Sequence, residues 1–310
     1  MENLREFIEK VNTKVKFSGC LNYNEPMASH TTFKVGGNAD IWIKPGKEVF
    51  LDYVSLLLAL AREEGFPVFI LGAGANIVCS DRGIRGIVLD TGFWEGCTFN
   101  KNSVSVFSGT QVDNLADTLA ESGFSGLEFL AGLPGSVGGA VWMNARCYEK
   151  SVSDVLIETE ILDENFKREV IPFNADSFSY KKSPFQERDV LILRAGFSIK
   201  PGEKETIKSE MAFFREDREK KGHYRFPSAG SAFKNSRDFG APTGKIIDEL
   251  GLKGFSVGGA QVAPWHGNII INKGNATASD IKKLMDEISK KVNEKLKINL
   301  ESEILFIGEW

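Results

Sequence analysis

The chain has 310 residues, of which 42% are hydrophobic and 26% are charged, a composition typical of a globular protein with about two domains. Lysine and arginine number 38 against 42 aspartates and glutamates, which gives a net charge of −4 and argues against a nucleic-acid-binding protein. No apolar run is long enough to cross a bilayer, and the charged residues 1–17 do not resemble a secretory signal, so we expect a cytoplasmic protein.

The first two thirds of the sequence mix helix and strand patterns. We expect an N-terminal helical segment in residues 1–30. Apolar residues at helical spacing, each followed by glycine, predict two further helices, Glu48–Glu64 and Val112–Ser122. Short apolar or alternating runs predict strands between and after these helices: Pro67–Leu71, Gly86–Asp90, Ser103–Gly109, Ile157–Leu162 and Val190–Ile199.

The sequence pattern changes from strand-like apolar runs to a highly charged segment at Pro201-Gly202, which favours a domain boundary there. A highly charged helix is predicted over Glu203–Lys221, followed by an irregular glycine-containing segment. The last part of the chain predicts a strand at Asn268–Asn272, a long helix from Ala278 and a closing strand at Glu303–Ile307. Thr277 followed three residues later by Asp280 is typical of a capping box at the start of that helix.

Thirty-one glycines form clusters between the apolar runs. One cluster, Gly72, Ala73, Gly74, Ala75 and Asn76, follows a predicted strand. The backbone N–H groups of such a loop can converge on a phosphate. The spacing lacks the third glycine of a dinucleotide fingerprint, so a plain turn between strands is an equally valid interpretation.

A second cluster lies in Ala131–Ala140, which contains no charged residue. Its glycines and small side chains cannot build a hydrophobic core, yet the segment is too apolar for a solvent loop. We interpret it as a backbone-lined slot for a flat or phosphorylated ligand. The alternative is a tight turn packed on a neighbouring helix.

Ser231 lies between small residues in Pro227–Asn235. Because the chain has no Gly-x-Ser-x-Gly elbow, a role as an acylating nucleophile is disfavoured; spacing alone does not separate a proton relay from a turn residue. The four cysteines and three histidines have no metal-ligand spacing, so we expect buried, inert thiols in a reducing cytoplasm and no metal site.

Six motifs occur in an order that resembles the UDP-N-acetylenolpyruvoylglucosamine reductase family. The resemblance runs from about Thr31 to Gly308. The motifs that carry it are His30–Gly37, Leu71–Asn76, Glu128–Ala140, Pro227–Asn235, Gly258–Val262 and Leu300–Ile304. Only seven residues, Ser236–Pro242, separate Asn235 from Thr243, so the chain resembles the family type that lacks an inserted tyrosine-bearing loop.

The resemblance implies an α+β fold with non-covalently bound FAD. It implies a two-lobed FAD-binding domain of the vanillyl-alcohol-oxidase flavoprotein type over 31–200, after the helical segment 1–30. A smaller α+β substrate-binding domain follows over 201–310, and its closing strand returns toward the flavin site. The implied partners are a UDP-sugar and NADPH, with no nucleic acid and no membrane, and we expect a monomer.

The resemblance also assigns catalytic positions. The serine that is the family's proton donor falls on Ser231, and the second glutamate of the closing motif falls on Glu303. The family's arginine in Tyr-Arg-x-Ser is replaced by Lys181 in the Tyr180–Ser183 segment. We expect that segment to be extended, so that Lys181 and its neighbour Lys182 point to opposite faces.

The implied reaction is hydride transfer from a flavin, first reduced by NADPH, to the methylene carbon of an enolpyruvyl ether. Lys181 would stabilise the resulting enolate and Ser231 would protonate the α carbon. Glu303 would donate a hydrogen bond if protonated or hold Lys181 if ionised. The FAD phosphates are expected on the backbone of Gly72, Ala73, Gly74, Ala75, Asn76, Pro134, Gly135, Ser136, Gly138 and Gly139. Substrate contacts are expected from Tyr180, Lys234, Asn235, Arg218 and Arg225.

Two other interpretations stay open. A flavoprotein oxidase of the same fold, acting on a small alcohol or hydroxy acid, would share the glycine loops but would not be expected to carry the serine and closing glutamate motifs. A non-enzymatic binding module would explain the loops but not motifs that span both domains.

Overall fold

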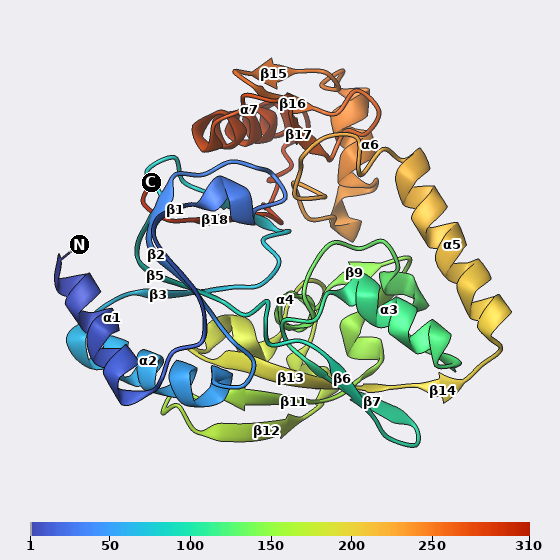
Figure 1. The fold of residues 1–310 in the computed structure, drawn as a ribbon. Coiled ribbons are helices and arrows are strands. Elements are labelled where there is room, and N and C mark those ends of the chain that lie inside the picture. Colours follow the sequence, from blue (N-terminus) through green and yellow to red (C-terminus); the bar gives the residue numbers. More distant parts are fainter. Residues whose placement is uncertain (1) are drawn as a thin grey trace. The chain divides into compact units, whose positions relative to one another are not determined.

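The computed structural model describes residues 2–310 (Figure 1). The chain divides into two compact units that are interleaved in sequence. Unit 1 comprises the chain up to Tyr23, Ile41–Ala73 and Gly86–Glu216, and unit 2 comprises Asn24–Asp40, Gly74–Arg85 and Asp217–Trp310. None of the described helices is both long and apolar enough to cross a membrane.

The first lobe of unit 1 is built around a four-stranded sheet with two helices. The strand order is β1-β2-β5-β3, and β3 runs parallel to β5. The residues Phe50, Tyr53, Val54 and Leu57 of one helix are fully buried in this core. The elements are α1 (Glu2–Lys14), β1 (Gly19–Pro26), β2 (Asn38–Pro45), α2 (Phe50–Glu64), β3 (Val68–Leu71) and β5 (Ile84–Asp90).

The second lobe of unit 1 has its own hydrophobic core, to which helices α3 and α4 and an antiparallel five-stranded sheet contribute. The strand order of this sheet, drawn in Figure 1, is β12-β11-β13-β7-β6. Helix α3 contributes Val112, Leu115, Ala116 and Leu119 to that core. The sheet and its helices are β6 (Cys97–Phe99), β7 (Ser103–Phe107), α3 (Val112–Glu121), α4 (Val137–Trp142), β11 (Leu156–Leu162), β12 (Arg168–Pro172) and β13 (Leu191–Ser198). Two short antiparallel pairs complete it: β8 (Phe124–Ser125) with β14 (Lys200–Pro201), and β9 (Arg146–Cys147) with β10 (Lys150–Ser151).

Unit 2 packs a long helix on a three-stranded antiparallel sheet of order β15-β16-β17. The buried stripe of that helix is Ile281, Leu284, Met285, Ile288 and Val292. A separate parallel pair joins β4 to β18. The elements are β4 (Ile77–Cys79), α6 (Thr243–Glu249), β15 (Ser256–Val257), β16 (Ala260–Val262), β17 (Ile270–Asn272), α7 (Ala278–Leu296) and β18 (Leu305–Ile307), and α5 (Lys204–Lys220) carries the chain from unit 1 into unit 2.

The predicted elements correspond to observed ones with ends shifted by a few residues. Helix α2 stops where glycine was expected to stop it, because Gly65 adopts φ +76° and its N–H closes on carbonyls of the last turn. The capping box of Thr277 and Asp280 is also present. The segment expected to be helical over residues 1–30 contains helix α1 but continues as strand β1. Strand β1 lies at the edge of its sheet, and its residues alternate between exposed and half-buried. Because it contains few apolar residues, its sequence gives only a weak strand signal.

Candidate functional site

The segment that carries Ser231 lies in unit 2 between two other segments of backbone. Ser231 pairs with Ile269 on one side, and Phe233 pairs with Ser302 on the other. The N–H of Glu303 donates to the carbonyl of Ala232 at 2.9 Å. The two positions expected to act in catalysis, Ser231 and Glu303, are therefore joined through one intervening residue, and their backbones are fixed to each other.

Asn76 ties a third segment to this pair. Its side-chain Nδ2 donates to the Glu303 carbonyl at 3.0 Å, and its own carbonyl accepts from the N–H of Leu305 at 3.0 Å. From there β4 and β18 run parallel, with Ile77 opposite Leu305. The sequence predicted Asn76 as a cofactor-binding residue; the structure gives its side chain a direct role in holding Glu303.

The basic residues expected to meet the substrate have different surroundings in unit 2. Lys234 forms an ion pair with the exposed Glu301, and Arg225 is exposed with its guanidinium 5.1 Å from the centre of the Trp265 ring. Asn235 accepts from the N–H of Thr243 at 2.8 Å, at the start of α6. Arg218, on α5, is 6% exposed. It is therefore buried, although an arginine most often lies on the surface.

Two histidines lie near Arg218 in the same unit, with ring centres 6.2 Å apart. Burial lowers the pKa of His223 to about 4, with a further contribution from the charge of Arg218. Burial also lowers the pKa of His266, helped by Lys221. Both imidazoles are therefore uncharged at neutral pH. Nδ1 of His266 accepts from the N–H of Asn268 at 3.1 Å.

Lys181 lies in unit 1 in a tight turn, and the expectation of an extended segment is wrong. The N–H of Lys182 donates to the carbonyl of Ser179 at 3.0 Å, and Lys181 has φ +59°. A positive φ at this position is typical of a turn, where neighbouring side chains do not alternate between two faces. Tyr180, the residue before it, is 41% exposed.

Side chains rather than a strand hold this turn against the end of helix α4. The carbonyl of Trp142 accepts from Ser183 Oγ at 2.7 Å and from Gln186 Nε2 at 2.8 Å. The same Gln186 donates to the carbonyl of Lys181 at 3.0 Å. Asn144 donates to the carbonyl of Ser179 at 2.9 Å. Because α4 has six residues, the turn is about 9 Å along the helix from the glycine-rich loop at its start.

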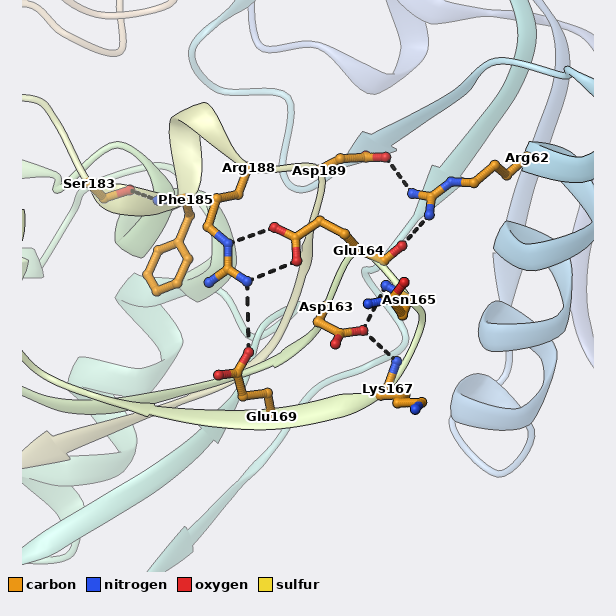
Figure 2. A network of polar contacts seen from close by, with 10 residues as sticks. All are labelled: Arg62, Asp163, Glu164, Asn165, Lys167, Glu169, Ser183, Phe185, Arg188 and Asp189. Atoms are coloured by element: carbon orange, nitrogen blue, oxygen red, sulfur yellow. Dashed lines mark hydrogen bonds and ion pairs between the residues drawn. The ribbon is translucent and has the colours of Figure 1, made fainter.

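The chain after this turn is braced by charged side chains (Figure 2). Arg188 pairs with Glu164 at 2.7 Å and with Glu169 at 3.7 Å. Arg62 of α2 donates to the Glu164 carbonyl and pairs with Asp189 at 2.6 Å. The Arg188 guanidinium holds the pKa of the Glu164 carboxyl at about 2 through its hydrogen bond. The brace is charged at neutral pH, and its Glu164 and Arg188 side chains are half-buried.

The two glycine-rich loops present unused backbone donors. Among residues 2–310, no acceptor is found for the backbone N–H groups of Gly72–Asn76, nor for those of Gly135 and Ser136. A Cβ on Gly72 would lie 2.4 Å from Ser136 Oγ, so only glycine allows this approach. Ser136 Oγ caps α4 by accepting from the Gly139 N–H. Uncharged loops with free amides fit a bound phosphate group.

A buried hydroxyl lies beside the second loop. Ser108 is 2% exposed, and its Oγ has no hydrogen-bond partner within residues 2–310. Its carbonyl accepts from the Gly138 N–H at 2.8 Å. A buried polar atom left in this state is uncommon, and its position beside the loop fits a polar ligand atom there. The part of the chain that the structure describes holds no group of three or more potential metal ligands.

Comparison with known proteins identifies the class first. An FAD-binding domain profile matches residues 51–166, and a profile described as the C-terminal domain of UDP-N-acetylenolpyruvoylglucosamine reductase matches residues 222–307. The chain is thus an FAD-dependent oxidoreductase built from an FAD-binding domain and a distinct C-terminal domain. The predicted α+β, two-domain fold class is confirmed.

Full-length relatives then show the family. The chain is 40% identical to UDP-N-acetylenolpyruvoylglucosamine reductase of Treponema denticola, with all of both chains aligned. It is 37% identical to that of Borreliella burgdorferi, over 99% of each. The crystal structure of the Thermus caldophilus reductase superposes with a TM-score of 0.76 at 31% identity, over 94% of this chain and 99% of that one. The chain belongs to the UDP-N-acetylenolpyruvoylglucosamine reductase family, as the six motifs predicted.

Several supporting residues were missed by the sequence analysis. Asn144 and Gln186 hold the Lys181 turn, and Asn268 contacts the Ser231 segment. Asn268 had one visible signal, since it is a polar residue directly before the apolar run Ile269–Ile271. Asn144 and Gln186 had none, because their role depends on which distant backbone the fold brings beside them.

Proposed function

We propose that this protein reduces the enolpyruvyl group of UDP-N-acetylenolpyruvoylglucosamine to give UDP-N-acetylmuramate, with NADPH as the hydride donor, as a cytoplasmic step of peptidoglycan precursor synthesis. The single observation that carries this proposal is the backbone connection of Ser231 to Glu303 through Ala232. Family membership supports this substrate, since the full-length relatives are reductases named for it.

The proposal places the FAD pyrophosphate on backbone amides. Free N–H groups at Gly72–Asn76, and at Gly135 and Ser136, support this assignment, because neither loop contains a charged side chain. The neighbouring Pro134, Gly138 and Gly139 keep the second loop close to its ligand. When bound, non-covalent FAD supplies the hydride chemistry, and the protein orients and polarises the substrate.

Three residues then act on the substrate. A hydride reaches the methylene carbon, and the electron pair of the carbon–carbon double bond becomes an enolate on the carboxylate side. Lys181 stabilises that negative charge as a preorganised cation. Ser231 delivers a proton to the α carbon, which yields the saturated lactyl ether. Glu303, fixed beside the Ser231 segment, is the hydrogen-bond donor to the developing charge.

Cations and polar groups for the UDP portion come from the same segments. Lys234 and Asn235 follow Ser231 closely, and the ion pair of Lys234 with exposed Glu301 can exchange for a phosphate. Arg218, Arg225 and Tyr180 complete the proposed substrate contacts. We assign residues 31–200 as the FAD-binding domain, which also contributes Tyr180 and Lys181 to the substrate, and residues 201–310 as the UDP-sugar-binding domain of a monomer.

The decisive experiment assays purified protein in parallel under anaerobic and aerobic conditions. A yellow protein whose NADPH oxidation depends on added UDP-N-acetylenolpyruvoylglucosamine, with UDP-N-acetylmuramate as product, is the expected result. NADPH oxidation that depends only on oxygen would overturn the proposal in favour of an oxidase. A colourless protein that cannot be reconstituted with FAD would overturn it in favour of a binding module.

A further inference from the structure

A buried asparagine side chain in unit 2, that of Asn268, forms the backbone hydrogen bonds that a neighbouring strand would otherwise provide. Asn268 is 3% exposed. Its Oδ1 accepts from the N–H of Phe233 at 3.0 Å, and its Nδ2 donates to the carbonyl of Phe233 at 2.8 Å. The carbonyl of Asn268 also accepts from the N–H of Ala232 at 2.8 Å. One residue thus satisfies three backbone polar groups of the Ser231 segment: the N–H of Ala232 and both the N–H and the carbonyl of Phe233.

These contacts occupy the side of the segment that faces away from Glu303. Ala232 offers its carbonyl to Glu303 and its N–H to Asn268. Phe233 is 1% exposed, so shortening Asn268 removes the partners of two peptide groups in a buried residue. Leaving a buried backbone group unsatisfied is unfavourable, so the segment would move to recover a partner. The movement would change the position of Ser231 relative to Glu303.

We infer that Asn268 is a positioning residue, which holds the Ser231 hydroxyl in the place required for protonating the substrate without contacting the substrate itself. This inference rests on the proposed function. A displacement of about 1 Å in a reacting group can slow a reaction by roughly 10²-fold. Asn268 is fixed in turn, since its N–H donates to His266 Nδ1 at 3.1 Å.

The test separates the two half-reactions by stopped-flow absorbance of the flavin. In Asn268→Ala we expect reduction by NADPH within about twofold of wild type, and reoxidation by the UDP-sugar slower by about 10- to 100-fold. The same substitution is then made in a Ser231→Ala background. If Asn268 acts through Ser231, it changes reoxidation there by less than about threefold, because the group that it positions is absent.

Asn272→Ala is the matched control. Asn272 is also a buried asparagine, with its Nδ2 on the carbonyl of Phe33 at 3.1 Å and its Oδ1 on the N–H groups of Gly274 and Ala276. We expect it to lower the melting temperature as Asn268→Ala does, yet to keep a normal reoxidation rate. Asn268→Asp retains the shape and the acceptor but removes the donor, so it provides a second variant if Asn268→Ala does not fold.

Three results would overturn the inference: an equal slowing of both half-reactions, the same slowing with and without Ser231, or the same slowing in Asn272→Ala. Normal reoxidation in both Asn268 variants would also overturn it while leaving the proposed function intact. A wild-type enzyme that the UDP-sugar does not reoxidise would instead contradict the proposed function. The two failures are therefore distinguishable in one experiment.

Discussion

The segments that carry Ser231 and Lys181 are built in contrasting ways. The Ser231 segment is held by an isolated backbone bridge on each side, from Ser231 to Ile269 and from Phe233 to Ser302, and Ala232 and Phe233 are buried. Lys181 is held in a turn at φ +59°, and the contacts that fix it come from the side chains of Gln186 and Asn144. The Ser231 position is thus set by backbone bridges supported by one buried side chain, Asn268, and the Lys181 position mainly by side-chain hydrogen bonds.

This difference matches the tasks that we assign. A proton donor must meet a single carbon at a defined distance and angle, which favours a rigid frame. A charge that stabilises an enolate acts over a longer range and tolerates more freedom. The comparison predicts that changes around Ser231 act sharply on one chemical step, whereas changes around Lys181 are graded and depend on solution conditions.

The largest expected effect is that of Ser231→Ala. Reoxidation of reduced flavin by the UDP-sugar should slow by about 10²–10⁴-fold, because a positioned proton donor is lost. Reduction by NADPH should be unchanged, since it needs no proton on the substrate. Stopped-flow measurement of both half-reactions checks this, with Ser228→Ala of the same segment as the control. Reoxidation within about threefold of wild type would contradict the role.

Lys181→Met should slow reoxidation by at least about 10²-fold, the scale for removing one preorganised charge-stabilising group. Methionine is as unbranched as lysine at Cβ, so the strain of the positive φ stays the same and the charge alone is tested. Lys181→Arg should recover part of the rate, because a planar fork only partly replaces a compact ammonium. Lys182→Met is the exposed neighbouring control, and equal losses in both methionine variants would remove Lys181 from the mechanism.

Gly72→Ala tests the flavin loop, which belongs to neither of the compared segments. The added Cβ would press on Ser136 Oγ and displace it from the Gly139 N–H. Losing such a helix cap costs about 1 kcal/mol, and the added methyl group also crowds the loop. Together we expect these two effects to raise the FAD dissociation constant about tenfold. Titration of apoprotein with FAD measures it. Gly240→Ala, at an open turn, should bind FAD normally; equal weakening in both would contradict the loop assignment.

The smallest effect concerns the brace near the Lys181 turn. The pKa of Glu164 is lowered from 4.5 to about 2 in the folded protein by its hydrogen bond to Arg188. Its stabilisation is therefore present above about pH 4.5 and is lost as the pH falls toward 2. Glu164→Gln should lower the melting temperature by about 1–3 °C at pH 7, as expected for an exposed pair.

That difference in melting temperature between wild type and Glu164→Gln should close as the pH is lowered, and it should shrink in high salt. Glu187→Gln, an exposed carboxylate of the same loop, is the control and should show no such pH-dependent difference. A Glu164→Gln difference that stays constant from pH 7 to pH 3 would show that the brace does not stabilise through charge.

The sequence predicted most elements because their signals are local. The apolar stripe of α7 and its cap at Thr277 are visible in the residues themselves, as is the stop of α2 at Gly65. Strand β1 was not predicted, since its alternation is mostly polar and its partner β2 is contributed by a later segment. The irregular stretch after α5 concealed helix α6, which is only seven residues long.

The site was predictable in its residues but not in its supports. Ser231 and Glu303 were found from family motifs, and their connection through Ala232 follows only from the fold. The turn at Lys181 was missed because a positive φ at a lysine has no composition signal, unlike one at glycine. The Asn268 side chain bonds to the backbone of Phe233, which is 35 residues earlier in the sequence. The Gln186 side chain bonds to the carbonyl of Lys181 across a turn. Hydrophobic periodicity in the sequence does not predict either hydrogen bond.

The parallel pairing of β18 with β4 also constrains how the molecule assembles. Leu305 lies opposite Ile77, and Ile307 opposite Cys79, so more than two hundred residues of chain separate the partners. Closing so long a loop is slow compared with forming helices or hairpins. During synthesis β4 cannot pair with β18 until almost all of the chain has been made. By contrast, every strand of the five-stranded sheet of unit 1 has been synthesised once the chain reaches Ser198. Unit 1 is therefore expected to fold first, and the segment holding Glu303 is among the last to take its place.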